Sequence, residues 1–184
     1  VARRAGVSKG TLFLYFASKE DLFKAVVREN LSVRFPQWNI LLDGFPGTSA
    51  EMLRFAMREW WAQIGDTKVS GISKLMISEA SNFPELALFY QHEVIEPGNA
   101  LIRRILQRGV ERGEFRALDL QYAVHTVIAP MLYLIIGKYS FGACVPQHSV
   151  LVPTDYLDAQ VDILLHGFCV DRANPPTSFT RPHP

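Results

Sequence analysis

Four side chains that could contact a nucleic acid lie close together near the start of the sequence: Lys9, Thr11, Tyr15 and Lys19. A lysine ammonium can bind a phosphate or a base edge, and a threonine can bond a phosphate while its methyl group meets a thymine. Lys19 is expected at the beginning of a helix, where free backbone N–H groups add to the attraction for phosphate. The pattern favours contact with DNA, and the alternative is the solvated face of a helical hairpin.

The elements that must position these side chains can be predicted from residues 5–23, which indicate a turn, a short helix, a second turn and a capped longer helix. Gly6 can adopt the positive φ that a sharp turn between helices requires. Ser8 can cap the short helix. Leu12 and Phe16, four residues apart, share one face and leave the polar side chains on the other. Such a helix suits a helix-turn-helix recognition element that enters a major groove.

The same residues resemble the TetR-type (TetR/AcrR-like) repressor family. The matching elements are Ala5-Gly6-Val7-Ser8, Gly10-Thr11-Leu12, Tyr15-Phe16, Ser18-Lys19-Glu20 and Leu22-Phe23. The resemblance implies an all-α fold, with a helix-turn-helix DNA-binding head followed by an all-helical regulatory and dimerisation body that often binds a small ligand. No enzymatic activity and no cofactor are expected, because the sequence has no nucleophile–base pair, phosphate loop or metal cluster. The residues expected at the DNA are Ser8, Lys9, Gly10, Thr11, Phe13, Leu14, Tyr15 and Lys19.

The sequence departs from the family pattern in two places. The family often has Tyr at the position of Phe13, and His or another polar residue at the position of Leu14. Loss of the phenol removes one phosphate contact and makes base choice depend more on Lys9 and Thr11. The family also places one full helix and most of a second before Gly6, so the head is expected to be N-terminally incomplete.

The distribution of charge agrees with a basic head. The chain has 184 residues, 48% of them hydrophobic and 20% charged, with a net charge of +1, which is typical of a globular protein. Residues 1–34 contain seven basic and three acidic residues, and the remainder contains 12 basic and 15 acidic residues. A basic head on a mildly acidic body suits contact with phosphates, although random asymmetry of this size is the alternative.

Other chemistries find little support. Cys144 and Cys169 are the only cysteines and are expected to be small buried apolar residues, with a redox pair as the alternative. No metal-ligand spacing, phosphate loop or nucleophile–base pair is present. The longest apolar run, residues 127–137, is shorter than the ~18–20 residues that span a bilayer. It predicts a core or interface helix in a soluble, cytoplasmic protein.

Helical periodicity predicts the rest of the organisation. Residues 1–35 form the partial head with its connecting helix, residues 48–170 the ligand-binding and dimerisation domain, and residues 171–184 an extended or disordered tail. Pro36 is expected to end the connecting helix, and residues 34–47 to form a turn-rich connection. Helices are expected over 48–64, 68–81, 85–113 with a break at Pro97, 119–139 with a kink at Pro130, and 154–170.

A ligand pocket could involve the aromatic residues of the body. The candidates are Trp60, Trp61, Phe89, Tyr90 and His125, although each of them alone is better explained by core packing. The adjacent Trp60 and Trp61 cannot both face one core, so one of them should line a cavity, a groove or an interface. We expect His125 to be buried and hydrogen-bonded, with a role as a polar ligand anchor or at a dimer axis as the alternatives.

The last two predicted helices carry more apolar residues than a small body readily covers, which predicts a homodimer. The expected interface residues are Val127, Met131, Ile135, Leu157, Val161, Leu164 and Phe168.

The favoured interpretation is a ligand-responsive repressor. The two heads of its dimer would reach major grooves ~34–36 Å apart on a near-palindromic operator. A small apolar or aromatic effector would favour wrongly spaced heads. The alternatives are a helical ligand carrier or enzyme without DNA binding, and a body that only dimerises and binds ligand.

Overall fold

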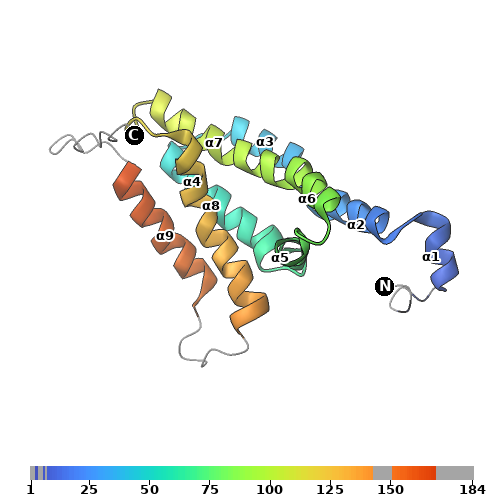
Figure 1. Ribbon diagram of the computed structural model, residues 1–184. Coiled ribbons are helices and arrows are strands. Elements are labelled where there is room, and N and C mark those ends of the chain that lie inside the picture. Colours follow the sequence, from blue (N-terminus) through green and yellow to red (C-terminus); the bar gives the residue numbers. More distant parts are fainter. Residues whose placement is uncertain (1–2, 4–5, 7, 143–150, 169–184) are drawn as a thin grey trace, which may run out of the picture.

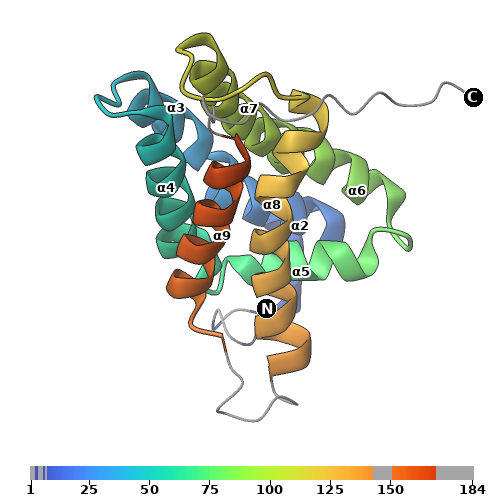
Figure 2. The same cartoon turned by 90° about the vertical axis from the view of Figure 1, so that its left-hand side faces the viewer.

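The computed structural model describes residues 3, 6, 8–142 and 151–168, and every regular element in this described part is helical. Figure 1 shows an elongated arrangement, with helix α1 at one end, beyond α2, and α9 at the other. Figure 2 shows α8 and α9 side by side on one face of the body. The expected all-α fold is confirmed. Both cysteines, most of the predicted loop before the last helix and the tail lie outside the described residues.

The helices of the head begin where their caps predict. Helix α1 (Lys9–Tyr15) starts after Ser8, whose Oγ accepts from the N–H of Thr11 at 3.0 Å. Gly6 has the expected positive φ of 68°. Helix α2 (Lys19–Val27) starts after Ser18, whose Oγ accepts from the N–H of Asp21 at 3.0 Å. Short-range capping therefore determines both helix starts.

The segment after α2 differs from the prediction. Helix α2 passes into a π-helical turn, η1 (Arg28–Ser32), and a further helix, α3 (Arg34–Asp43), follows. Pro36 lies in the first turn of α3, where backbone N–H groups have no partner within the helix, so its missing donor does no harm. The turn-rich connection predicted over 34–47 is therefore wrong for most of its length. The domain limits drawn at residues 35 and 48 stay a prediction.

Four α-helices and two π-helical turns form the middle of the chain. Helix α4 (Ser49–Trp60) has a capping box between Thr48 and Glu51 and continues as the π-helical turn η2 (Trp61–Gly65). Helix α5 (Ser70–Glu79) and helix α6 (Pro84–Tyr90) follow. A third π-helical turn, η3 (Gln91–Ile95), leads into α7 (Glu96–Glu111). The break predicted at Pro97 takes this form, with Pro97 in the first turn of α7.

Two long helices complete the body. Helix α8 (Leu120–Ile136) is capped by Asp119, runs through Pro130 without interruption and continues as the π-helical turn η4 (Gly137–Phe141). Helix α9 is Pro153–Phe168. The stretch Leu120–Ser140 is long and apolar enough to cross a membrane by length and composition alone. Core helices of soluble proteins pass the same test, and α8 packs against α7, α9 and α5.

Two groups of buried side chains form the core. The larger group joins α4, α7, α8 and α9, and the smaller one joins α2 and η1 to η2, α5 and α6. Trp38 and Trp60 are half-buried and pack against both groups. These two indoles therefore lie where the segment that carries the head meets the body.

The residues predicted at the dimer interface lie mostly inside a single chain. Leu164 is half-buried against the core. The other six are buried: Val127, Met131, Ile135, Leu157, Val161 and Phe168. These six side chains stabilise their own chain and cannot present a surface to a partner, so this choice of interface residues is corrected. Helix α8 is apolar around most of its circumference, so its sequence pattern cannot separate a core face from a partner face.

Candidate functional site

The outer surface of α1 is unusually apolar for a solvated helix. The side chains of Leu14 and Tyr15 are 84% and 80% exposed, and that of Phe13 is 45% exposed. Leu12 and Phe16 are half-buried on the inner side, as their spacing predicts. Three consecutive large side chains on an exposed helix suit contact with a partner surface, and α1 lies at the far end of the molecule where a partner can reach it (Figure 1).

The polar candidates of the head have different surroundings. The Thr11 hydroxyl lies 2.8 Å from the Ser8 hydroxyl, so both residues serve the cap of α1. Gly10 is exposed on α1, which begins with Lys9. Lys19 is exposed at the first residue of α2. The positive charge of Lys19 and the free N–H groups of the first turn of α2 both attract phosphate.

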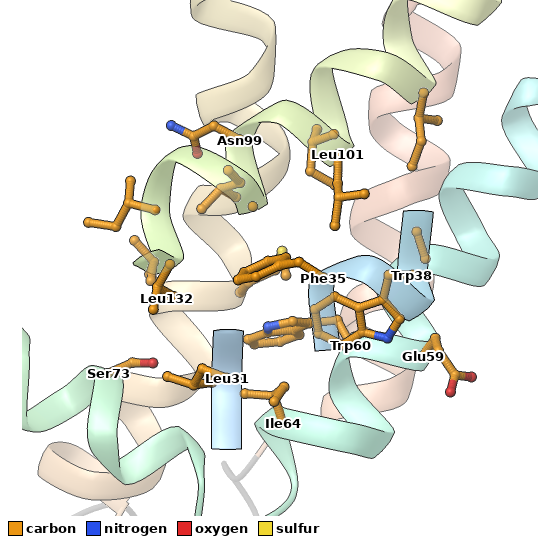
Figure 3. Close-up of a pocket in the computed structure, with 18 of the residues that line it drawn as sticks. Leu31, Phe35, Trp38, Glu59, Trp60, Ile64, Ser73, Asn99, Leu101 and Leu132 are labelled. Atoms are coloured by element: carbon orange, nitrogen blue, oxygen red, sulfur yellow. The ribbon is translucent and has the colours of Figure 1, made fainter. Parts of the chain in front are cut away.

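A second candidate site is a cavity of about 310 Å³ inside the body. The segment that follows α2 contributes Leu31, Phe35 and Trp38 to its wall, and α4 contributes Ala56 and Trp60. Figure 3 shows the rings of Phe35, Trp38 and Trp60 close together around its centre. The remainder of the wall comes from α5, α6, η2, η3, α7 and α8. A largely apolar cavity of this size is typical of a small-molecule site.

The structure places three of the five predicted ligand residues in this wall: Trp60, Tyr90 and His125. Trp61 is buried in the larger core group instead. Trp60 packs against the same group, so the expectation that the two indoles cannot both face one core is wrong, although Trp60 also lines the cavity. Phe89 also lies outside the wall. The guanidinium carbon of Arg28 lies 5.0 Å from its ring centroid, which indicates a cation–π contact.

His125 is exposed at the edge of the cavity, so the expectation of a buried, hydrogen-bonded histidine is wrong. His125 lies on the side of α8 that lines the cavity, together with Ile128. A histidine in this place remains available to a ligand.

Sequence reasoning missed the aromatic residues that follow the head. Phe35 and Trp38 fall in the segment predicted to be a turn, yet their rings are 5.6 Å apart, centroid to centroid, in an edge-to-face arrangement. Their spacing of three residues is the signal that could have indicated a helix here. Asn99 and Ser73 were also missed, because neither belongs to a motif.

The cavity has few polar groups and little charge. The Tyr90 hydroxyl donates to Ser73 Oγ at 2.8 Å, and burial raises the pKa of the Tyr90 phenol against the opposing effect of that hydrogen bond. The phenol is therefore neutral at physiological pH. Glu59 is the one carboxylate in the described wall, and it accepts a hydrogen bond from Gln63 Nε2. None of the described wall residues is a lysine or an arginine.

Comparison with known proteins identifies the family of the chain. Residues 1–26 match the family model described as bacterial regulatory proteins, tetR family, and residues 47–139 match the one described as tetracyclin repressor-like, C-terminal domain. The crystal structure of a protein assigned to the TetR-family transcriptional regulators, from Mesorhizobium loti MAFF303099, has a similar fold. Its TM-score is 0.67, at 21% sequence identity over 92% of this chain and 84% of that one. The comparison with curated proteins finds no significant match. The two family matches together show that the chain belongs to the TetR family of transcriptional regulators.

Proposed function

We propose that the protein is a cytoplasmic repressor that binds a near-palindromic DNA operator as a homodimer and is released by a small, uncharged, largely apolar effector. The observation that carries this proposal is the course of the chain after α2. The helix that positions Lys19 leads directly into Leu31, Phe35 and Trp38, which line the cavity. Any molecule that fills the cavity therefore contacts the segment that holds the DNA-binding head.

The head supports DNA binding through α1 and the beginning of α2. Exposed Tyr15 and Lys19 would contact phosphates, and α1 would enter the major groove with Lys9 and Thr11 near the bases. Because Thr11 also serves the helix cap, its hydroxyl is oriented before DNA arrives. Phe13 and Leu14 would contribute apolar contacts, such as those with thymine methyl groups.

The polarity of the cavity supports an uncharged effector. A charged group moved from water into an apolar wall loses its hydration, and this loss is tolerated only where an opposite charge receives it. The Glu59 carboxylate already accepts a hydrogen bond from Gln63. Figure 3 shows this carboxylate to one side of the aromatic rings. Asn99, Ser73 and His125 can instead bond a hydroxyl or carbonyl of a neutral ligand.

A dimer is supported by an uncharged surface that α8 and α9 share. Its side chains are partly or largely exposed: Tyr122, Thr126, Ala129, Tyr133, Tyr156, Gln160 and Ile163. We call this set the α8–α9 face. The charged Asp158 and Asp162 of α9 instead pair with arginines of α4, which leaves the α8–α9 face free of charge. Four helices from two copies would pack here as a bundle.

The test is selection of bound sequences from a random duplex library by the full-length protein, followed by binding measurements on the enriched DNA. We expect two related half-sites centred about 10 base pairs, or a multiple of this distance, apart. The affinity should fall steeply with salt and on addition of a neutral naphthalene derivative. A ligand carrier would bind the naphthalene derivative but enrich no DNA sequence, and that outcome would refute the repressor.

A further inference from the structure

We propose that Gln63 is the positioning residue through which occupancy of the cavity reaches the DNA-binding head. This inference rests on the proposed function and names the group that couples its two sites. We use the term connector for residues 28–43, which comprise η1 and α3. The connector follows α2 directly, so its position determines that of the head.

The side-chain amide of Gln63 makes three hydrogen bonds. Its Oε1 accepts from Nη1 of Arg34 at 3.1 Å and from Nε1 of Trp38 at 3.2 Å. Its Nε2 donates to the carboxylate of Glu59. Arg34 and Trp38 belong to the connector, whereas Gln63 and Glu59 belong to the η2 and α4 segments of the body. This amide is therefore one of the groups that fasten the connector to the body, and the one that bonds Trp38 of the cavity wall.

The chemistry of these partners requires a carboxamide. Arginine and the indole of tryptophan can only donate, and an ionised glutamate can only accept, so the amide orientation is determined by its neighbours. A glutamate at position 63 would set two carboxylates side by side, and a leucine would leave the donors of Arg34 and Trp38 without this acceptor. Gln63 is thus matched to a junction of two donors and one acceptor.

Gln63 lies immediately behind the cavity wall. Trp38 and Glu59 line the cavity, whereas Gln63 does not, and Figure 3 shows Trp38 and Glu59 at the same side of the cavity. A ligand that packs against the Trp38 ring would therefore shift the indole N–H that donates to Gln63 Oε1. Gln63 itself can respond to a ligand through the two wall residues that it bonds, Trp38 and Glu59.

Two further attachments of the connector remain when the Gln63 bonds break. On its later part, Arg104 of α7 donates to Oδ1 of Asn39 at 2.9 Å and to the Asn39 backbone oxygen at 3.1 Å, and it pairs with Asp43 at 3.2 Å. On its earlier part, the backbone oxygen of Glu93 accepts from Ser32 Oγ at 3.3 Å, and the Glu93 carboxylate pairs with Nε of Arg28 at 3.3 Å.

Phe35 and Trp38, which line the cavity, lie in the sequence between the Glu93 and Arg104 attachments. A ligand that displaces the Trp38 ring would release the Gln63 attachment alone. The connector would then be held by Glu93 and Arg104, and a shift of its middle part would carry α2 and α1 with it.

The experiment follows amide hydrogen exchange of residues 28–43 with and without N-phenyl-1-naphthylamine, a neutral fluorescent probe whose binding is measured by its own emission. In the wild-type protein we expect the probe to accelerate exchange of the connector about two- to tenfold, the factor that corresponds to losing one hydrogen bond. Gln63→Leu should bind the probe normally, because residue 63 does not line the cavity. Its connector should exchange rapidly from the outset and show no further response to the probe.

Gln107→Leu is the matched control. Gln107 Nε2 donates to Glu111 Oε1 at 2.7 Å, so it makes the same glutamine–glutamate contact, four residues apart on one helix, but away from the connector. This variant should respond to the probe as the wild type does. Trp38→Phe removes the indole donor and part of the ring volume but keeps an aromatic wall. At matched probe occupancy it should lose the response, and it serves as the second variant if Gln63→Leu folds poorly.

Three results would overturn the inference. Probe binding without any change in connector exchange would refute it while leaving the cavity intact. A wild-type response in both Gln63→Leu and Trp38→Phe would show that the coupling passes elsewhere. Absence of probe binding to the wild type would remove the proposed effector site as well, so that failure is distinguishable from the other two.

Discussion

The phenol ring of Tyr133 on α8 lies 5.8 Å from that of Tyr156 on α9, centroid to centroid, with 41° between the ring planes. Tyr133 is 54% exposed and Tyr156 is half-buried, so the pair is covered on one side only. Burial, and to a lesser extent Tyr133, raises the pKa of the Tyr156 phenol. The Tyr156 phenol is therefore neutral at physiological pH, and the two rings present an aromatic surface at the centre of the α8–α9 face.

Replacing one exposed residue of the α8–α9 face by an acid should separate the dimer. Ile163→Asp would place an unpaired carboxylate in the desolvated interface and weaken association at least tenfold, since an unpaired buried charge is worth more than ~1.4 kcal/mol. Multi-angle light scattering at micromolar concentration should report a monomer with unchanged helical circular dichroism.

Ile40→Asp is the control for this substitution. Ile40 on α3 is 71% exposed and Ile163 is 68% exposed, so both variants carry the same change at similar exposure. An intact dimer in Ile163→Asp, or a monomeric wild type, would contradict the proposed interface. Val161→Asp is unsuitable for this purpose, because Val161 is buried within its own chain and the variant should unfold.

Lys19→Ala should weaken binding to every DNA sequence to a similar extent. An exposed lysine at the start of α2 acts as a point charge without base preference, so the slope of log affinity against log salt should fall by about 1. Lys68→Ala removes the same charge from an exposed position between η2 and α5 and should leave the slope unchanged. Equal slopes for all three proteins would argue against a phosphate contact at Lys19.

Tryptophan fluorescence should distinguish the two adjacent indoles. The neutral compound 1-naphthol should quench the emission in a saturable manner, because Trp38 and Trp60 line the cavity. Trp60→Phe should remove much of this quenching and Trp61→Phe little, since Trp61 lies in the core. His125→Ala should reduce the affinity only modestly, by less than about tenfold, because its contact is a single hydrogen bond at the exposed edge.

The anion 1-naphthoate tests the proposed lack of charge in the effector. Its ring matches that of 1-naphthol, but its carboxylate would lose water in a described wall without lysine or arginine. We expect binding at least tenfold weaker than that of 1-naphthol. Equal affinities would show that the cavity does not select against charge.

The ion pair between Arg58 and Asp158 should make stability fall at acid pH. Nε and Nη2 of Arg58 donate to the two carboxylate oxygens of Asp158 at 2.9 and 2.6 Å. These hydrogen bonds, more than the charge itself, lower the pKa of Asp158. A carboxylate whose pKa is lower in the folded state stabilises the protein above its unfolded pKa of about 4, and this contribution is lost as the pH falls below that value.

Asp158→Asn should therefore lower the urea midpoint slightly at pH 7 and have little effect near pH 3. The effect should shrink in high salt, since the pair is solvent-exposed. An equal deficit at both pH values would mean that Asp158 acts through packing rather than through its charge.

Local patterns in the sequence were sufficient for the head and for most helix starts. The caps at Ser8, Ser18, Thr48 and Asp119 join atoms two or three residues apart. Such bonds depend on residue type and spacing alone, so they can be predicted without knowledge of the remaining chain. The two family matches at residues 1–26 and 47–139 rest on the same kind of information.

The connector shows where local reasoning fails. Pro36 is a strong signal for the end of a helix, yet α3 begins only two residues before it and accommodates it in its first turn. The stability of α3 comes from aromatic packing, since Phe35 and Trp38 lie against the core that other helices build. Tertiary contacts therefore stabilise a helix, α3, that the local sequence around Pro36 disfavours.

The sequence by itself determined that this chain is an all-helical protein with a helix-turn-helix head, because helical periodicity and helix caps are short-range properties. Only the tertiary structure decided which apolar faces form the core, which residues enclose the cavity and what holds the head to the body. Gln63 meets Trp38 across 25 residues, and Arg28 meets Glu93 across 65. Periodicity identifies the face of a helix that must be buried, but the neighbour that buries it depends on how all the helices pack together.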